Sequence, residues 1–333
     1  MKFTDIKTIV KAHIEANDTK TTIHIAGSPG CGKSALGEEI GEELGFDKVV
    51  TINLSMLDIP DVAGLYFPDK ESGTLKFYAS PMITQLQTGR NLLIIDEFAD
   101  ANIQMQNVGR RISWAREVNG TKLSPETYLL AMSNRSLDKS GAGKLSGKVK
   151  NAVSQLSMES NLDDFVAWAM TKGDIDPVLI QFLRFKPNLL DMYNADAETS
   201  PTPRQWELVN RVPASLRQDL FFADVASKVG EGPAAEYTGF RKIYESLVSF
   251  EEVVMDPTGV KIPADLSAQY AIVGSVAHNV SPQNIERVAK FVERLPTDFG
   301  VMFWQDTIRK TPAIKTTKPF IAWATSAGNV VLN

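Results

Sequence analysis

The sequence predicts an α/β first half, with a parallel sheet covered by helices on both faces, followed by an all-α second half. Three observations support this fold class. Short apolar strand patterns alternate with helical patterns up to about residue 160. A glycine-rich loop joins the first of these strands to a helix. Beyond that point only helical patterns remain, and prolines and glycines separate them.

The elements follow in chain order. Five parallel strands are expected at residues 21–26, 48–54, 91–95, 127–132 and 152–158. A helix at 35–44 places Ala35, Leu36, Ile40 and Leu44 on one face. Residues 58–81 contain four aromatic residues between prolines and glycines, and we expect an irregular functional loop there. The second half predicts helices at 163–171, 177–185, 203–212, from 213 onwards, and at 233–248, 264–278, 282–294 and 297–310.

Composition limits the class of protein. The chain has 333 residues, 43% of them hydrophobic and 23% charged, which suits a globular protein of two domains. No apolar run reaches the roughly 20 residues that span a bilayer. The first residues lack the apolar core of a signal peptide. One cysteine excludes an internal disulfide. We therefore expect a cytoplasmic protein without a membrane span.

The net charge of −5 argues against a surface that binds nucleic acid as a whole. One basic, glycine-spaced segment stands out. It is expected to be a solvated loop or, alternatively, an element that faces a phosphate or a partner. Its lysines are Lys139, Lys144, Lys148 and Lys150.

The glycine-rich loop matches the phosphate-binding pattern G-x-x-x-x-G-K-[ST]. Its backbone N–H groups and the helix that follows favour a phosphate chain. Lys33 is expected to reach the β- and γ-phosphates of ATP, and the Ser34 hydroxyl to bind Mg²⁺. Cys31 is either a tolerated residue or makes activity sensitive to oxidation. The predicted nucleotide-binding residues are Gly27, Ser28, Pro29, Gly30, Cys31, Gly32, Lys33, Ser34 and Ala35.

Two acids end the third strand, at the sheet edge where the phosphate loop is expected. Asp96 is expected to hold Mg²⁺ through water. Glu97 is expected to orient and deprotonate the attacking water, which favours hydrolysis over transfer to a hydroxyl. Asn134 ends the next strand and either holds that water or is an ordinary turn residue.

The order of these motifs resembles the AAA+ ATPases, and within them the MoxR-like branch. Residues 27–34 match Walker A, 92–97 Walker B and 132–134 sensor 1. Residues 58–64 look like the start of that branch's helix-2 insert. Residues 200–206 look like the sensor 2 helix, with Arg204 reaching the γ-phosphate.

The resemblance implies an αβα core with strand order 5-1-4-3-2, a helical lid and a ring, usually hexameric. Such proteins use ATP and Mg²⁺ to remodel or mature a client protein, and many work beside a von Willebrand factor A domain protein. The resemblance divides the chain into a core at 1–160 with an insert-like loop at 56–82, a lid at 161–250 and a C-terminal helical extension at 251–333.

The sequence departs from the family in one respect. AAA+ rings complete each site with an arginine from the neighbouring subunit, but no arginine occurs between Arg135 and Arg184. Lys148 and Lys150 occupy the corresponding region, although a lysine lacks the bidentate fork. The alternatives are weak or partner-dependent hydrolysis, or a trans arginine from the set Arg110, Arg111 and Arg116.

Two other functions stay open from the sequence. The first is an AAA+ protein that loads or moves on nucleic acid, although the sequence shows no helix-turn-helix and no basic stripe. The second is a monomeric P-loop phosphotransferase or signalling NTPase.

Overall fold

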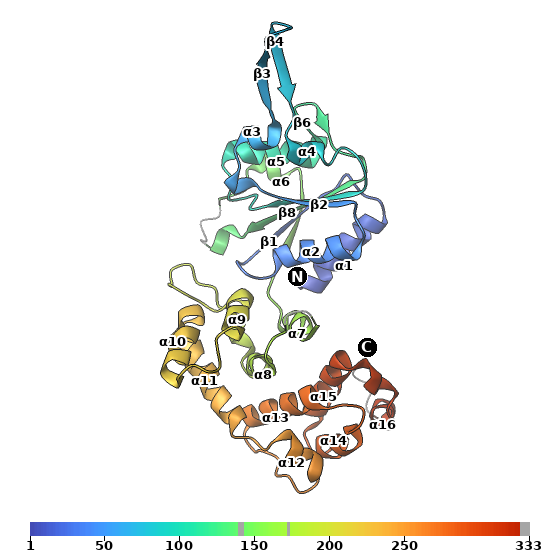
Figure 1. Ribbon diagram of the computed structural model, residues 1–333, viewed down its shortest axis with the longest axis vertical. Helices are drawn as coiled ribbons and strands as arrows, with labels where there is room; N and C mark the ends of the chain where they lie inside the picture. Colours follow the sequence, from blue (N-terminus) through green and yellow to red (C-terminus); the bar gives the residue numbers. More distant parts are fainter. Residues whose placement is uncertain (139–142, 172–173, 327–333) are drawn as a thin grey trace. The chain divides into compact units, whose positions relative to one another are not determined.

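The computed structural model describes residues 1–138, 143–171 and 174–326. It divides into two compact units (Figure 1). Unit 1 comprises Met1–Asn161 with Tyr193–Glu198, and unit 2 comprises Leu162–Met192 with Thr199–Asn333. The division into core, lid and extension that the sequence suggested stays a prediction.

Unit 1 is built on one five-stranded sheet. Its strands are β1 (Thr22–Gly27), β2 (Lys48–Asn53), β5 (Asn91–Asp96), β8 (Thr127–Asn134) and β9 (Ser154–Met158). All neighbours are parallel, in the order β2-β5-β8-β1-β9. Counted along the chain and read from the other edge, this is the expected order 5-1-4-3-2. All five predicted strands are therefore confirmed to within about two residues.

Helices cover both faces of this sheet (Figure 1). One face packs against α1 (Phe3–Glu15) and α2 (Lys33–Glu43), and the other against α5 (Ile103–Ala115) with α6 (Gly147–Lys150). Alternation along β5 explains the two cores, because Leu92 and Ile94 enter the first while Leu93 and Ile95 enter the second. The predicted αβα class is confirmed, and α1 is an additional helix that the sequence analysis did not predict.

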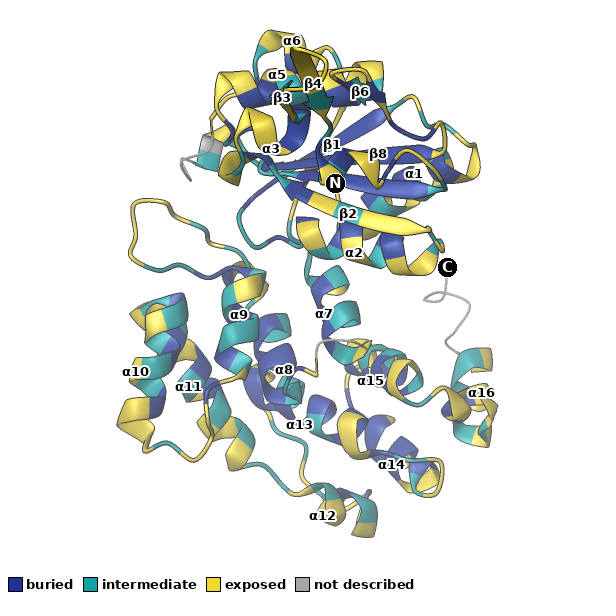
Figure 2. Cartoon of the chain, turned by 45° about the horizontal axis from the view of Figure 1, so that its top comes forward, coloured by how far each residue is buried: buried dark blue, intermediate teal, exposed yellow. Residues whose placement is uncertain are grey.

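The segment 58–81 is not an irregular loop, and that expectation is wrong. It forms α3 (Ile59–Ala63), a hairpin of β3 (Leu65–Asp69) and β4 (Thr74–Tyr78), and α4 (Pro81–Thr84). Aromatic residues favour these strands, and Gly73, with φ +65°, permits the tight turn between them. Figure 2 shows that most of the hairpin is exposed. A shorter hairpin of β6 (Glu117–Val118) and β7 (Thr121–Lys122) also went unpredicted.

Helices are the regular elements of unit 2, and its described residues form no strand, as predicted. Two of its helices, α12 and α16, were not expected. In the described chain no helix has both the length and the apolar character needed to cross a membrane. The helices are α7 (Leu162–Thr171), α8 (Pro177–Phe185), α9 (Pro203–Asn210), α10 (Gln218–Val229), α11 (Glu231–Glu245), α12 (Phe250–Met255), α13 (Leu266–Asn279), α14 (Ile285–Val292), α15 (Thr297–Lys310) and α16 (Lys318–Ser326).

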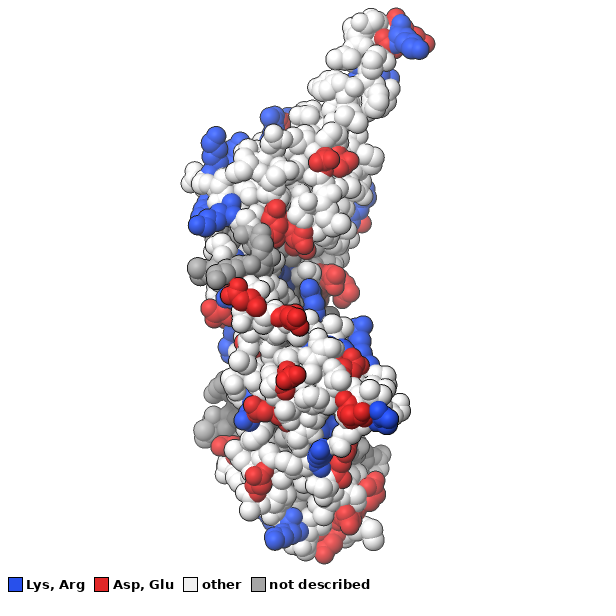
Figure 3. Space-filling view, turned by 90° about the vertical axis from the view of Figure 1, so that its left-hand side faces the viewer, with Lys and Arg blue, Asp and Glu red and all other residues white. Residues whose placement is uncertain are grey.

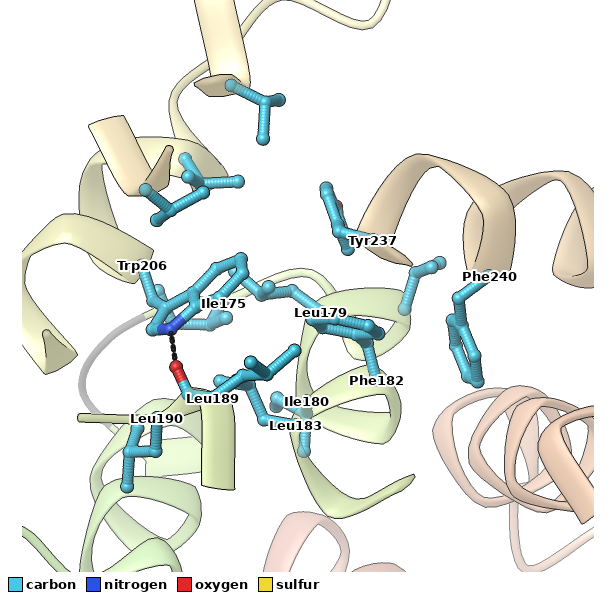
Figure 4. Close-up of a cluster of buried hydrophobic side chains, with 14 of the residues drawn as sticks. Ile175, Leu179, Ile180, Phe182, Leu183, Leu189, Leu190, Trp206, Tyr237 and Phe240 are labelled. Atoms are coloured by element: carbon cyan, nitrogen blue, oxygen red, sulfur yellow. Dashed lines mark hydrogen bonds between the residues drawn. The ribbon is translucent and has the colours of Figure 1, made fainter. Parts of the chain in front are cut away.

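Unit 2 holds two hydrophobic cores. The first surrounds Trp206 and Phe182, both fully buried, whose rings lie 5.5 Å apart (Figure 4). The indole Nε1 of Trp206 donates to the Leu189 carbonyl at 2.7 Å, so this buried polar atom is satisfied. The second core gathers the C-terminal helices around Phe303. Helix α13 contributes Ala271 to the first core and its next residues to the second, so it connects the two.

Candidate functional site

The phosphate loop lies between β1 and α2, as its motif requires. Gly32 is the N-cap of α2 and has φ +100°, a conformation that other residues rarely adopt. Gly27 is confined for a different reason, because a Cβ there would lie 2.6 Å from the Cys31 Sγ. The loop is therefore tightly closed, and its glycines cannot be replaced without movement.

Lys33 folds back onto this loop and is 8% exposed. Its ammonium donates to the carbonyl oxygens of Gly27, at 3.0 Å, and Ser28, at 2.9 Å. The Cys31 Sγ lies 3.9 Å from the same Nζ. The positive charge is thus held at the mouth of the loop, where the motif expects phosphate.

Asn134 meets Lys33 from the neighbouring strand. Strands β1 and β8 pair in register with Gly27 opposite Asn134, so both strands end at the same level. The Asn134 Oδ1 accepts from the Lys33 Nζ at 3.1 Å. The structure therefore brings together two of the predicted site residues that are 101 positions apart.

The two acids follow β5 at the same edge of the sheet. Asp96 is the last residue of β5, and its Oδ1 accepts from the Glu97 backbone N–H at 2.8 Å. Glu97 has φ +51°, which turns the chain sharply away from the sheet. Strain of this kind clusters at functional sites.

The oxygen donors at this edge fit a magnesium ion. Mg²⁺ is usually held by one or two carboxylates together with substrate phosphates and water, rather than by a cage of protein ligands. Ser34, exposed in the first turn of α2, and Asp96 supply such donors. Among the described residues no cluster of three His, Cys, Asp or Glu forms a self-contained metal site.

A serine and an asparagine contact Glu97, and the sequence analysis did not identify either of them. The Ser55 hydroxyl donates to the Glu97 carboxylate. The Asn53 Oδ1 in turn accepts from the Ser55 backbone N–H, at 3.1 Å, and from its hydroxyl, at 2.8 Å. The end of β2 therefore fixes the position of the Glu97 side chain.

A third acid, Asp100, belongs to the same cluster. Burial raises the pKa of its carboxyl, and the neighbouring charge of Glu97 raises it further, while Lys33 opposes the shift. The Asp100 backbone N–H donates to the Glu97 carbonyl at 3.0 Å. An acid three residues after Glu97 was visible in the sequence, but only the turn shows that it faces the site.

The other predicted residues occupy separate elements. Lys148 and Lys150 are exposed on α6 of unit 1, and Val149 between them is fully buried. Lys139 lies outside the described residues. Arg204 is exposed in the first turn of α9 in unit 2. Their roles toward a nucleotide stay predictions.

The alternative arginines differ in their surroundings. Arg111 pairs with Glu117 at 2.8 Å. Arg116 is the C-cap of α5. It lies near the start of β1, because the Thr22 Oγ1 at that end of the strand donates to the Ser113 carbonyl of α5. Lys33 follows the other end of β1. Burial lowers the pKa of Arg116 to about 10. Arg116 is therefore badly placed to serve a phosphate site.

The β3–β4 hairpin exposes apolar side chains on both of its faces. Tyr66 is 58% exposed and Phe67 51% exposed, although cross-strand partners contact both rings, Phe77 at 5.0 Å and Tyr78 at 5.7 Å between centroids. Figure 3 shows a stem that is largely free of charge and a charged tip. A two-stranded ribbon with two apolar faces is a candidate interaction surface.

Comparison with known proteins gives distant likenesses only. No family model matches the chain, and no curated protein matches it. Among solved structures, the Thermotoga maritima RuvB Holliday junction branch migration motor is 14% identical over 78% of this chain and 81% of that chain, with a TM-score of 0.41. NtrX from Brucella abortus is 14% identical over 90% of this chain and 67% of that chain, with a TM-score of 0.40.

The fold assignment rests on the topology of the chain itself. The sheet order, the phosphate loop after β1, the two acids after β5 and Asn134 at the end of β8 occur together. The fold is that of an AAA+ P-loop ATPase. A helical unit follows the αβα core in this chain, as the resemblance implied.

Proposed function

We propose that this chain is an ATP-hydrolysing AAA+ protein of the MoxR-like type, which assembles into a ring, expected to be hexameric, and remodels a client protein. One observation carries the hydrolytic part of the proposal. The Lys33 Nζ lies 3.1 Å from the Asn134 Oδ1. The charges of Lys33 and Glu97 both lie close enough to Asp100 to shift the pKa of its carboxyl. A cation, an amide and a general base therefore gather at one edge of the sheet.

Each group then has a chemical role. Lys33 exchanges its contacts with the loop carbonyls for the phosphates of ATP, with the loop N–H groups and the start of α2 assisting. Glu97 accepts the proton of the attacking water, and Asn134 holds that water in line. Ser34 and Asp96 would hold Mg²⁺, Asp96 through water, and the ion would supply positive charge beside the phosphates.

The ring and the client belong to the proposal as well. The exposed lysines of α6 support a site that is completed by the neighbouring subunit, and Arg204 of unit 2 is the proposed sensor of the γ-phosphate. The exposed aromatic faces of the β3–β4 hairpin support contact with a client. A von Willebrand factor A domain protein is the expected class of partner.

The decisive experiment separates binding from hydrolysis. Lys33→Ala should lose affinity for ATP, because the phosphates lose their cation. Glu97→Gln should bind ATP normally and lose turnover by about 10²-fold or more, as expected for removal of a general base. Isothermal titration gives affinity, and phosphate release gives turnover.

Glu126→Gln is the matched control, because Glu126 is an exposed acid of the same unit that precedes β8 at the far edge of the sheet. It should behave as the parent protein. Near-normal phosphate release by the purified Glu97 variant would overturn the assignment of the base. Failure of the parent protein to bind ATP would overturn the proposed function itself.

A further inference from the structure

A buried glutamine contacts the turn that carries Glu97. Gln106 lies on the inward face of α5 and is 3% exposed. Its Nε2 donates to the carbonyl oxygens of Ala99, at 3.3 Å, and Ala101, at 3.1 Å. The Ala101 backbone N–H donates to the Glu97 carbonyl at 3.2 Å, which closes the turn. Gln106 therefore holds the turn from within the core.

The same side chain also contacts the segment that leads into α6. The Gln106 Nε2 lies 3.4 Å from the Lys144 carbonyl oxygen, and its Oε1 accepts from the Ser146 N–H at 3.1 Å. Ser146 is the N-cap of α6, since its hydroxyl accepts from the Val149 N–H. One amide thus connects the Glu97 turn to the helix with the two exposed lysines.

The two segments also touch each other directly. A Cβ at Gly143 would lie 2.4 Å from the Ala99 carbonyl oxygen, so only glycine permits this approach. The backbone of Gly143 also stabilises the ionised Asp100 carboxylate and so lowers its pKa, against the larger effect of burial. The contact therefore includes a member of the acidic cluster as well as the backbone of the turn.

We infer that Gln106 is a positioning residue that couples the Glu97 turn to α6, so that a nucleotide bound at Lys33 changes the stability of α6. The physical reason is that both groups of the buried amide are in use. Movement of one segment alone would leave a buried carbonyl or N–H without a partner, which is unfavourable, so the two segments move together. The inference rests on the proposed function, because it requires ATP to bind.

Hydrogen exchange measured by mass spectrometry on the full chain tests this coupling. The probes are ADP and a non-hydrolysable ATP analogue, each with Mg²⁺, at saturating concentrations. In the parent protein the analogue should slow exchange in two peptides, 98–102 and 145–151, by about fivefold, the size of a modest coupling between sites. If the analogue slowed exchange only in peptide 98–102 and not in 145–151, the inference would be overturned.

Two variants then remove the connection. Gln106→Met has a side chain of similar size but removes both the donor and the acceptor. Gln106→Glu keeps the acceptor for the Ser146 N–H, but an ionised carboxylate cannot donate to the carbonyl oxygens. Both should bind the analogue with the parent affinity and slow exchange in 98–102, while the change in 145–151 falls below about twofold. The turnover number should fall without a rise in KM.

Gln181→Met is the matched control, since Gln181 is another buried glutamine, but in unit 2. It should leave both responses unchanged. Retention of both responses in the folded Gln106 variants would overturn the role of Gln106. If neither variant folds, the test on the parent protein still decides whether the two segments respond together. Absence of any nucleotide binding would instead count against the proposed function.

Discussion

The imidazole of His24 is buried in β1 and is 3% exposed; β8 separates this strand from β5, which leads to Glu97. Burial disfavours its protonated form and lowers its pKa from 6.5 to about 4. The unfolded chain therefore takes up a proton below about pH 6.5 while the folded chain does not. Above pH 6.5 the imidazole is neutral in both the folded and the unfolded chain, so it does not reduce the free energy of unfolding. As the pH falls from 6.5 toward 4, protonation of the unfolded chain lowers this free energy progressively.

We expect His24 to account for a loss of about 3 kcal/mol between pH 6.5 and pH 4, from roughly two and a half pKa units. The His24 Nε2 is hydrogen-bonded to the Ser133 hydroxyl. His24→Gln, whose amide can still contact Ser133, should remove that part of the pH dependence. The single cysteine, Cys31, is buried in unit 1, so urea-induced labelling of its thiol with a reagent active in acid reports unfolding of this unit. If the free energy of unfolding fell equally with pH in the parent and in His24→Gln, His24 would not be the group responsible.

At the scale of single elements, the β3–β4 hairpin makes the clearest prediction. Tyr66→Ala combined with Phe67→Ala removes two rings that are each more than half exposed. We therefore expect a stability change below about 1 kcal/mol and unchanged basal ATP turnover. The double variant should lose the proteins that co-purify with the Glu97→Gln chain, as seen by quantitative mass spectrometry.

Trp114→Ala is the control for this prediction, because Trp114 is an aromatic residue of unit 1 that is 73% exposed on α5. It should leave the co-purifying proteins in place. Misfolding of the hairpin variant would mean that these rings belong to a core and would refute the prediction. Loss of the same proteins with Trp114→Ala would show that their binding is not specific to the hairpin and depends on exposed aromatic rings in general.

The sequence predicted the sheet and the helices of unit 2 well, because continuous apolar strands and capped amphipathic helices carry strong local signals. It failed at the hairpin, where the prolines and glycines of residues 58–81 led us to expect an irregular loop, although an edge strand accepts a proline such as Pro68. The turn of β6 and β7 contains Asn119 and Gly120, both with positive φ, a hairpin signal that was present in the sequence. Helix α1 also had a detectable apolar stripe, seen in its three buried residues Ile6, Val10 and Ile14.

For the site, the motif residues could be predicted, but their neighbours could not. Lys33, Asp96, Glu97 and Asn134 sit where the strand ends place them. Ser55, Asp100 and Gln106 act through contacts between segments, and local sequence carries no signal for such contacts. The Ser55 contact, for example, spans 42 positions.

At the scale of the whole molecule, one buried ion pair joins distant helices of unit 2. Arg184 on α8 and Asp306 on α15 form a two-pronged pair, with Nη2 to Oδ1 at 2.6 Å, and Asp306 is 2% exposed. Arg184→Ala should destabilise unit 2 by about 3–5 kcal/mol, because it leaves a buried charge unpaired. Four of the five tryptophans lie in unit 2, so tryptophan fluorescence during urea unfolding measures the effect.

Two comparisons sharpen this prediction. Arg211→Ala breaks the exposed pair with Glu207 on α9 and should cost below about 0.5 kcal/mol. Arg184→Met combined with Asp306→Leu removes both charges and should recover most of the stability lost by Arg184→Ala. Equal effects of Arg184→Ala and Arg211→Ala would contradict the buried pair.

The proposed ring makes a prediction that no single chain can test. Lys148→Ala/Lys150→Ala should bind ATP but lose turnover by about 10³-fold, if its lysines act on the neighbouring site. Mixing it with Lys33→Ala, whose lysines are intact, should restore phosphate release, because some competent sites then face intact lysines. Lack of recovery in demonstrated mixed assemblies would argue against action in trans.

Full activity of the double lysine variant would point to Arg110 or Arg111 as the residue that acts in trans. A chain that stays monomeric with ATP would favour the phosphotransferase alternative.

The position of the β3–β4 hairpin has a consequence for evolution. Neither hydrophobic core of unit 1 includes a residue of β3 or β4. Substitutions there are therefore weakly constrained by stability, whereas the strands around Lys33 and Glu97 are strongly constrained. Homologous chains are expected to diverge fastest in this hairpin, so that the client contacted by its aromatic faces can change over time while the chemistry at the sheet edge is preserved.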